Sequence, residues 1–154
     1  MKANLKKIML ALAITSCALP GYFWLLPSRP VEIIAIHQEG NFSEVLVKSF
    51  PLTDKEKINW WLENKDLLKM KYNIPAPSAS GNFYVNFWDF REGYKEKGKY
   101  DRRCFDDMNT VKNCIDKNAV FSVENNRKKE TLFTVYDGRY RMEKNGKITQ
   151  LKDE

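Results

Sequence analysis

The chain has 154 residues, of which 43% are hydrophobic and 30% are charged, and its formal net charge is +6. Lys2, Lys6, Lys7 and Arg29 carry four of the 26 basic residues, so the region from Pro30 onward has 22 basic and 20 acidic residues, interspersed. Such a mixed surface argues against nucleic-acid binding. The length after the N-terminal segment predicts a single domain.

Residues 8–27, IMLALAITSCALPGYFWLLP, contain no charged side chain. As a helix, residues 8–26 would be about 28 Å long, close to the ~30 Å hydrocarbon core of a bilayer. Tyr22, Phe23 and Trp24 fall where an interfacial aromatic belt forms. We therefore expect residues 8–27 to be a transmembrane helix that anchors the chain in the lipid bilayer.

Three lysines precede the apolar stretch and one arginine follows it. The positive-inside rule then places residues 1–7 in the cytoplasm and residues 28–154 in the periplasm, on a single-pass inner-membrane protein. Two alternatives stay open. Residues 14–17 resemble a lipobox, which would make Cys17 a lipidation site, and a cleaved secretory signal would need an A-x-A-like site that is not seen. All three interpretations export the domain.

Cys104 and Cys114 are separated by nine residues. In an oxidising compartment they form a natural disulfide, which would stabilise the fold by about 2–3 kcal/mol. In the cytosol they would be two free thiols without a metal-ligand pattern.

The exported region begins with two strands. Residues 31–38 and 43–50 are rich in β-branched side chains, and Glu39-Gly40-Asn41 between them predicts a hairpin turn. His37, the single histidine, stands near the end of the first strand. Because one histidine without partners supports neither a triad nor a metal site, we expect it at the surface or lining the turn.

A helix follows. Thr53 and Glu56 form a capping box, and the helix should run to about Tyr72 with Asn73 near its C-cap. Apolar side chains at helical spacing predict the buried face; they are Ile58, Trp61, Leu62, Leu68 and Tyr72, with Leu67 beside them. Trp60 falls to the side of this stripe, where we expect packing rather than partner contact.

Residues 83–90, FYVNFWDF, carry apolar groups on both faces, which predicts a central strand covered by the helix on one side. Residues 93–114 predict a short hairpin or long loop pinned by the cysteine bridge. Four further strands are expected, at 119–124, 131–136, 139–143 and 147–151, with hairpin turns at Asp137-Gly138 and Asn145-Gly146. The fold class is therefore α+β: an antiparallel sheet of six or seven strands with one main helix.

No catalytic or nucleotide-binding motif is present, so we expect no enzyme, no cofactor and no metal site. Asp101, Asp106 and Asp107 could serve a hydrolase as acid–base groups or hold a cation. We favour instead a surface loop in which Arg102 and Arg103 neutralise these carboxylates locally.

Partner-binding surfaces are enriched in Trp, Tyr and Arg. On that basis, six side chains are candidates for contact with an unknown protein partner: Trp60, Trp88, Tyr94, Tyr100, Arg102 and Arg103.

Several runs of the sequence resemble an enterobacterial family of membrane proteins catalogued as domain of unknown function 943. These are INWWLENKDLLKMKYNIP (58–75), FWDFREGYKEKGKYDRRCFDDM (87–108), KNCIDKN (112–118) and RPVEIIAIHQEGNFSEVLVKSFP (29–51). The resemblance covers nearly the whole chain and implies an inner-membrane anchor with an exterior domain. It implies no activity, cofactor or catalytic residue.

From these observations we expect a membrane-anchored periplasmic module that binds a protein partner. One concrete form is an immunity-like protein that neutralises a toxin acting on the envelope. The alternatives are an envelope accessory or assembly subunit that acts through its membrane helix, and a lipoprotein.

Overall fold

The computed structural model describes residues 29–125, 128 and 130–152. The chain divides into two compact units, Met1–Pro30 and Val31–Glu154. Within the described part, no helix combines the length and apolarity that a membrane crossing requires. The predicted anchor at 8–27, with Cys17 and the aromatic belt at 22–24, lies outside the described residues.

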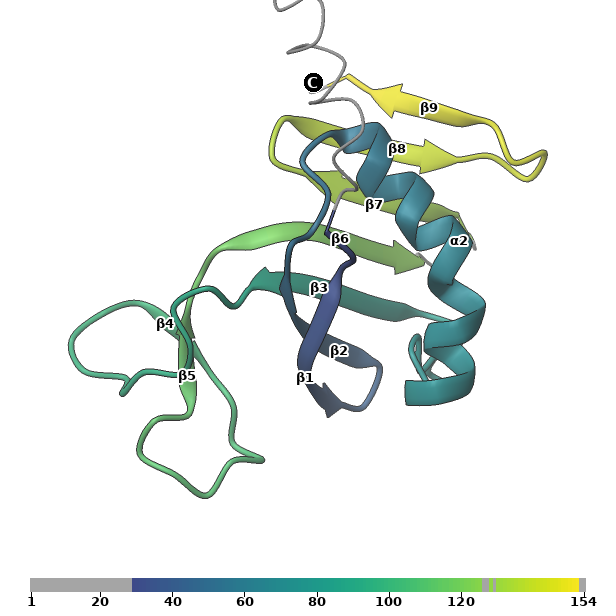
Figure 1. Cartoon of the computed structure of the whole chain (residues 1–154). Helices are drawn as coiled ribbons and strands as arrows, with labels where there is room; N and C mark the ends of the chain where they lie inside the picture. The colour runs from purple at the N-terminus through teal and green to yellow at the C-terminus, as the bar shows by residue number, and fades with distance from the viewer. Residues whose placement is uncertain (1–28, 126–127, 129, 153–154) are drawn as a thin grey trace, which may run out of the picture. The chain divides into compact units, whose positions relative to one another are not determined.

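The second unit is built on a seven-stranded sheet with one long helix, α2 (Asp54–Tyr72), across a face of it (Figure 1). The strands lie in the order β1 (Glu32–Glu39), β2 (Phe42–Lys48), β3 (Phe83–Asp89), β6 (Ala119–Asn125), β7 (Thr131–Val135), β8 (Gly138–Met142) and β9 (Ile148–Leu151). Two short strands, β4 (Arg102–Cys104) and β5 (Cys114–Asp116), pair with each other in a separate small sheet.

The prediction of a wholly antiparallel sheet is wrong at one position. β2 and β3 run parallel, with Val45 opposite Phe87, whereas every other neighbouring pair in the large sheet is antiparallel. The reason is the connection. A parallel pair needs a crossover, and α2 supplies it between β2 and β3.

The helix begins and ends as predicted. The Thr53 side chain accepts a hydrogen bond from the Glu56 amide, and the Glu56 carboxylate accepts one from the Thr53 amide. Hydrogen bonds from Thr53 lower the pKa of the Glu56 carboxyl. At the other end Asn73 adopts the left-handed conformation, with φ at 57°.

The main core lies between α2 and the sheet. The strands contribute Val45, Val47, Val85, Phe87, Phe121, Val123, Phe133 and Val135, and the helix contributes Ile58, Trp61 and Leu68. Trp60 packs here as predicted, with its ring 5.1 Å from that of Phe50 and 5.6 Å from that of Phe87. Leu67, which flanks the predicted buried face, is 50% exposed.

A second, smaller core covers the opposite face of β2. It consists of Leu46, Phe105 and Ile115, with Trp88 and Tyr94 packed against it. Because β2 is covered on both faces, Val45, Leu46 and Val47 are all buried. The covering segment is the excursion of residues 90–118 that leaves β3, forms β4 and β5, and returns to β6.

The C-terminal meander of β7, β8 and β9 is confirmed, and one of its turns is shifted. Val135 already pairs with Gly138, so the loop between β7 and β8 is Tyr136-Asp137 and lies one residue earlier than predicted. Gly146 has the positive φ, +83°, expected of a turn glycine.

The capping box gives a first prediction. Replacing Thr53 with Ala removes the hydroxyl that accepts the Glu56 amide, so the free energy of unfolding should fall by about 1 kcal/mol. Urea unfolding followed by circular dichroism measures this change. Thr110→Ala, which removes an exposed hydroxyl without a hydrogen bond among the described residues, should leave stability unchanged.

Candidate functional site

The β1–β2 hairpin places two polar side chains next to each other on the face away from α2. His37 and Glu44 are directly opposite in the register, and the turn between the strands uses Gly40 at φ +58°. His37 is 8% exposed and Glu44 is 5% exposed. Buried polar groups of this kind cost free energy unless they are hydrogen-bonded, so both need partners.

His37 finds its partners in the excursion. Its Nδ1 lies 2.8 Å and 2.9 Å from the two carboxylate oxygens of Asp107, and its Nε2 lies 2.8 Å from the Tyr94 hydroxyl. The ring also stacks on Phe105, with centroids 3.8 Å apart. Because the Asp107 carboxylate only accepts, Nδ1 carries a hydrogen, and in the neutral imidazole Nε2 accepts from Tyr94.

Glu44 is held from two sides. The Trp88 indole donates to Oε2 at 2.6 Å, and Nη2 of Arg103 donates to Oε1 at 2.8 Å. Both bonds are charge-assisted, which makes them stronger than bonds between neutral groups. The carboxylate therefore joins β2, β3 and β4.

The surroundings of Tyr94 keep its hydroxyl protonated. Burial of the phenol raises its pKa, and the negative charge of Asp107 raises it further. The hydroxyl consequently serves as a hydrogen-bond donor to His37.

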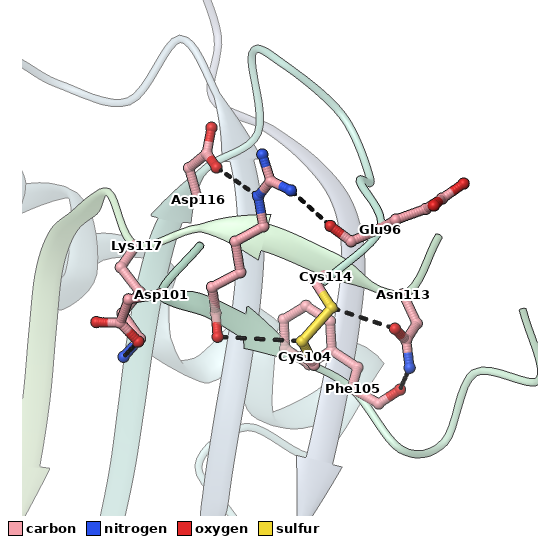
Figure 2. The surroundings of a disulfide bond; sticks show 9 residues. Glu96, Asp101, Cys104, Phe105, Asn113, Cys114, Asp116 and Lys117 are labelled. Atoms are coloured by element: carbon pink, nitrogen blue, oxygen red, sulfur yellow. Dashed lines mark hydrogen bonds and ion pairs between the residues drawn. A yellow bond between two sulfur atoms is a disulfide. The ribbon is translucent and has the colours of Figure 1, made fainter. Parts of the chain in front are cut away.

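Three interactions fix the excursion itself. The Cys104–Cys114 disulfide, predicted from the spacing, joins two residues that are directly opposite in the β4–β5 pair (Figure 2). Asp116 lies beyond the bridge and accepts from Lys95 and, at 2.9 Å, from Nε of Arg102. Hydrogen bonds from these two cations lower the pKa of Asp116.

Between the hairpin and this excursion lies a groove of about 190 Å³. Hairpin residues line one side and residues from β4 to Asp107 line the other; they are His37, Gln38, Glu39, Phe42 and Glu44, opposite Arg103, Cys104, Phe105, Asp106 and Asp107. We call this feature the hairpin groove. Within the described residues, no three His, Cys, Asp or Glu side chains are arranged to hold a metal ion.

The six predicted partner-binding side chains lie in different parts of the structure. Trp88, Tyr94 and Arg103 surround the buried pair, whereas Trp60 belongs to the main core. Tyr100 is exposed on the excursion and has the Arg102 guanidinium 4.8 Å from its ring centroid.

The expectation of local charge neutralisation in residues 101–107 is wrong. Arg103 pairs with Glu44 across 59 residues of sequence. Arg102 pairs with Asp116, and Asp101 pairs with Lys117 at 2.5 Å. Asp106 and Asp107 line the hairpin groove, and Asp101 does not.

The prediction of a surface or turn-lining His37 is also wrong, because its partners Tyr94 and Asp107 come from a distant segment. Sequence reasoning missed Glu44 as well. A usable signal was present: Glu44 shares its strand face with Leu46, and a continuous apolar run around Leu46 indicates that this face is covered. Phe42 and Phe105 had no comparable signal.

The model of a family described as "enterobacterial putative membrane protein", DUF943, matches residues 2–152. The chain belongs to this family. Membership confirms the resemblance and agrees with the predicted membrane location. No curated protein and no solved structure matches the chain. Because DUF943 supplies no activity, the groove is the guide to function.

The disulfide gives a second prediction. Replacing both Cys104 and Cys114 with Ser should lower the free energy of unfolding by about 2–3 kcal/mol, because the unfolded chain regains its freedom. Urea unfolding of the full chain in detergent measures this loss. A reductant should destabilise the natural sequence similarly and leave the double variant unaffected; an equal response of both would contradict the prediction.

Tyr94 gives a third prediction. Its pKa is raised in the folded state, so the unfolded state loses the phenol proton first as the pH rises. The stabilisation is therefore complete below about pH 10 and is lost above it. Tyr94→Phe should flatten this alkaline loss, measured by urea unfolding at pH 9 to 11. Tyr136→Phe, at a side chain that is 92% exposed, should not.

Proposed function

We propose that this DUF943 chain is an inner-membrane-anchored periplasmic module that captures a protein partner at the hairpin groove. Its role would be like that of an immunity protein that neutralises a toxin acting on the cell envelope. The floor of the groove is held in place by hydrogen bonds and lies outside the main core, which supports this proposal.

One observation carries the argument: two polar side chains, His37 and Glu44, are buried beneath an open groove and hydrogen-bonded by the excursion and, for Glu44, also by Trp88 of β3. Apolar side chains at these two positions would cover β2 without the free-energy cost of a buried polar group that lacks a hydrogen bond. A fixed polar floor instead gives a surface that is organised before binding, which lowers the ordering cost of association.

The size of the groove favours a protein partner over a small molecule. Small-molecule sites generally enclose about 300–1,000 Å³, whereas this groove encloses about 190 Å³. Phe42, which lines the groove, is a large apolar side chain that is 45% exposed. Exposed apolar side chains beside a pre-formed groove are typical of an interface anchor and its surroundings.

The disulfide supports a periplasmic location. Disulfides persist in oxidising compartments and are rare in the cytosol. A periplasmic domain on an inner-membrane anchor would meet envelope-acting proteins at the surface where they act.

The fourth prediction tests capture in cells. A photo-crosslinking amino acid at Phe42 should give a discrete crosslinked product, and the same amino acid at Leu67, exposed on α2, should not. Phe42→Ala should weaken the complex about thirtyfold if Phe42 is an interface hot spot worth about 2 kcal/mol. Leu67→Ala is the matched control. Equal crosslinking from both positions would refute capture at the groove.

An anchor exchange separates this proposal from its alternative. Replacing residues 8–26 with an unrelated membrane anchor should preserve the Phe42 crosslink. If the exchange abolishes it, the chain acts through its own membrane segment as an envelope accessory subunit. An envelope-acting toxin as the crosslinked protein would support the immunity-like role.

A further inference from the structure

We propose that the hairpin groove receives an arginine side chain presented by the partner protein. This inference rests on the proposed function and names the chemistry of the contact. Size, charge and aromatic surface each support it.

The groove matches one long side chain in size. Its volume of about 190 Å³ lies below the ~300–1,000 Å³ of most small-molecule sites. That space suits an extended side chain with a polar end. The floor is already in place, since His37 and Glu44 are more than nine-tenths buried and both are hydrogen-bonded on two sides.

The groove also carries excess negative charge. Four carboxylates line it, against the single guanidinium of Arg103, which is already paired with Glu44. At the rim, Glu39 and Asp106 are exposed and have no ion-pair partner in the described part of the chain. Complementarity of charge therefore selects a cationic group from the partner.

The aromatic surface distinguishes arginine from lysine. Phe42 is 45% exposed, lines the groove and stacks on Tyr84, with ring centroids 4.6 Å apart and planes 9° from parallel. A guanidinium is planar, weakly hydrated and stacks on aromatic faces, and its fork of donors fits carboxylates. An ammonium is a strongly hydrated point charge that gains less from such a wall.

The single histidine provides a direct reporter, because its imidazole lines the groove. We would titrate the full chain in detergent micelles with N-acetyl-arginine amide and follow the His37 imidazole resonance by NMR. The lysine and citrulline analogues are the comparison probes; citrulline keeps the shape of arginine and lacks its charge. A saturable shift should appear with arginine, weaken with lysine and be absent with citrulline.

Matched variants locate the site. Asp106→Asn and Glu39→Gln should each weaken arginine binding about two- to fivefold, the range for one exposed charge contact. Asp66→Asn and Glu63→Gln make the same changes at exposed positions of α2 and should have no effect. An unchanged His37 signal before titration shows that a variant retains the folded groove.

Three results would overturn the inference: no saturable shift up to the solubility of the arginine probe, an equal shift with citrulline, or equal weakening by the α2 variants. The crosslinking experiment distinguishes its failure from that of the proposed function. If Phe42→Ala abolishes capture of the partner but the arginine probe does not shift the His37 resonance, the groove binds a protein through a group other than an arginine side chain. If Phe42→Ala leaves capture intact, both proposals fall.

Discussion

Burial of the His37–Glu44 pair is the constraint on which the site depends. The hairpin turn sets these two side chains opposite each other on a covered face, where an unpaired carboxylate or imidazole would be costly. Their partners come from positions 44 to 70 residues away in sequence. The excursion of residues 90–118 must therefore lie over β1 and β2, and the groove is the space left between them.

The two faces of the sheet have different structural roles. On one face, α2 and the strands bury aromatic and branched side chains in the main core. On the other face, a small core of Leu46, Phe105 and Ile115 supports the polar network.

The disulfide contributes to the site because of the residues beside it in the chain, and it lies outside the main core. Cys104 directly follows Arg103 and precedes Phe105, so the bridge holds the two residues that bond Glu44 and stack on His37. Asp116, between Lys95 and Arg102, secures the same excursion electrostatically. In an oxidising compartment the bridge would stay closed and keep this geometry fixed.

The sequence alone determined the features that arise within a few neighbouring residues. The capping box at Thr53, the Asn73 cap, the β1–β2 turn, the meander and the cysteine pairing depend on local hydrogen bonds, backbone preference or short loop closure. Apolar periodicity likewise gave the helix face and the central strand. The sequence runs between residues 29 and 118 also indicated the family, and the match of the DUF943 model to residues 2–152 confirmed it.

Only the tertiary structure decided the parallel β2–β3 pair, the burial of His37, and the true partners of Glu44, Arg102 and Arg103. The physical reason is common to all of them. Each depends on which distant segment lies on a given sheet face, and composition and periodicity within a segment carry no information about its distant neighbour. For β2 and β3 the α2 crossover made that choice, and for His37 and Glu44 the long-range hydrogen bonds to buried polar groups made it.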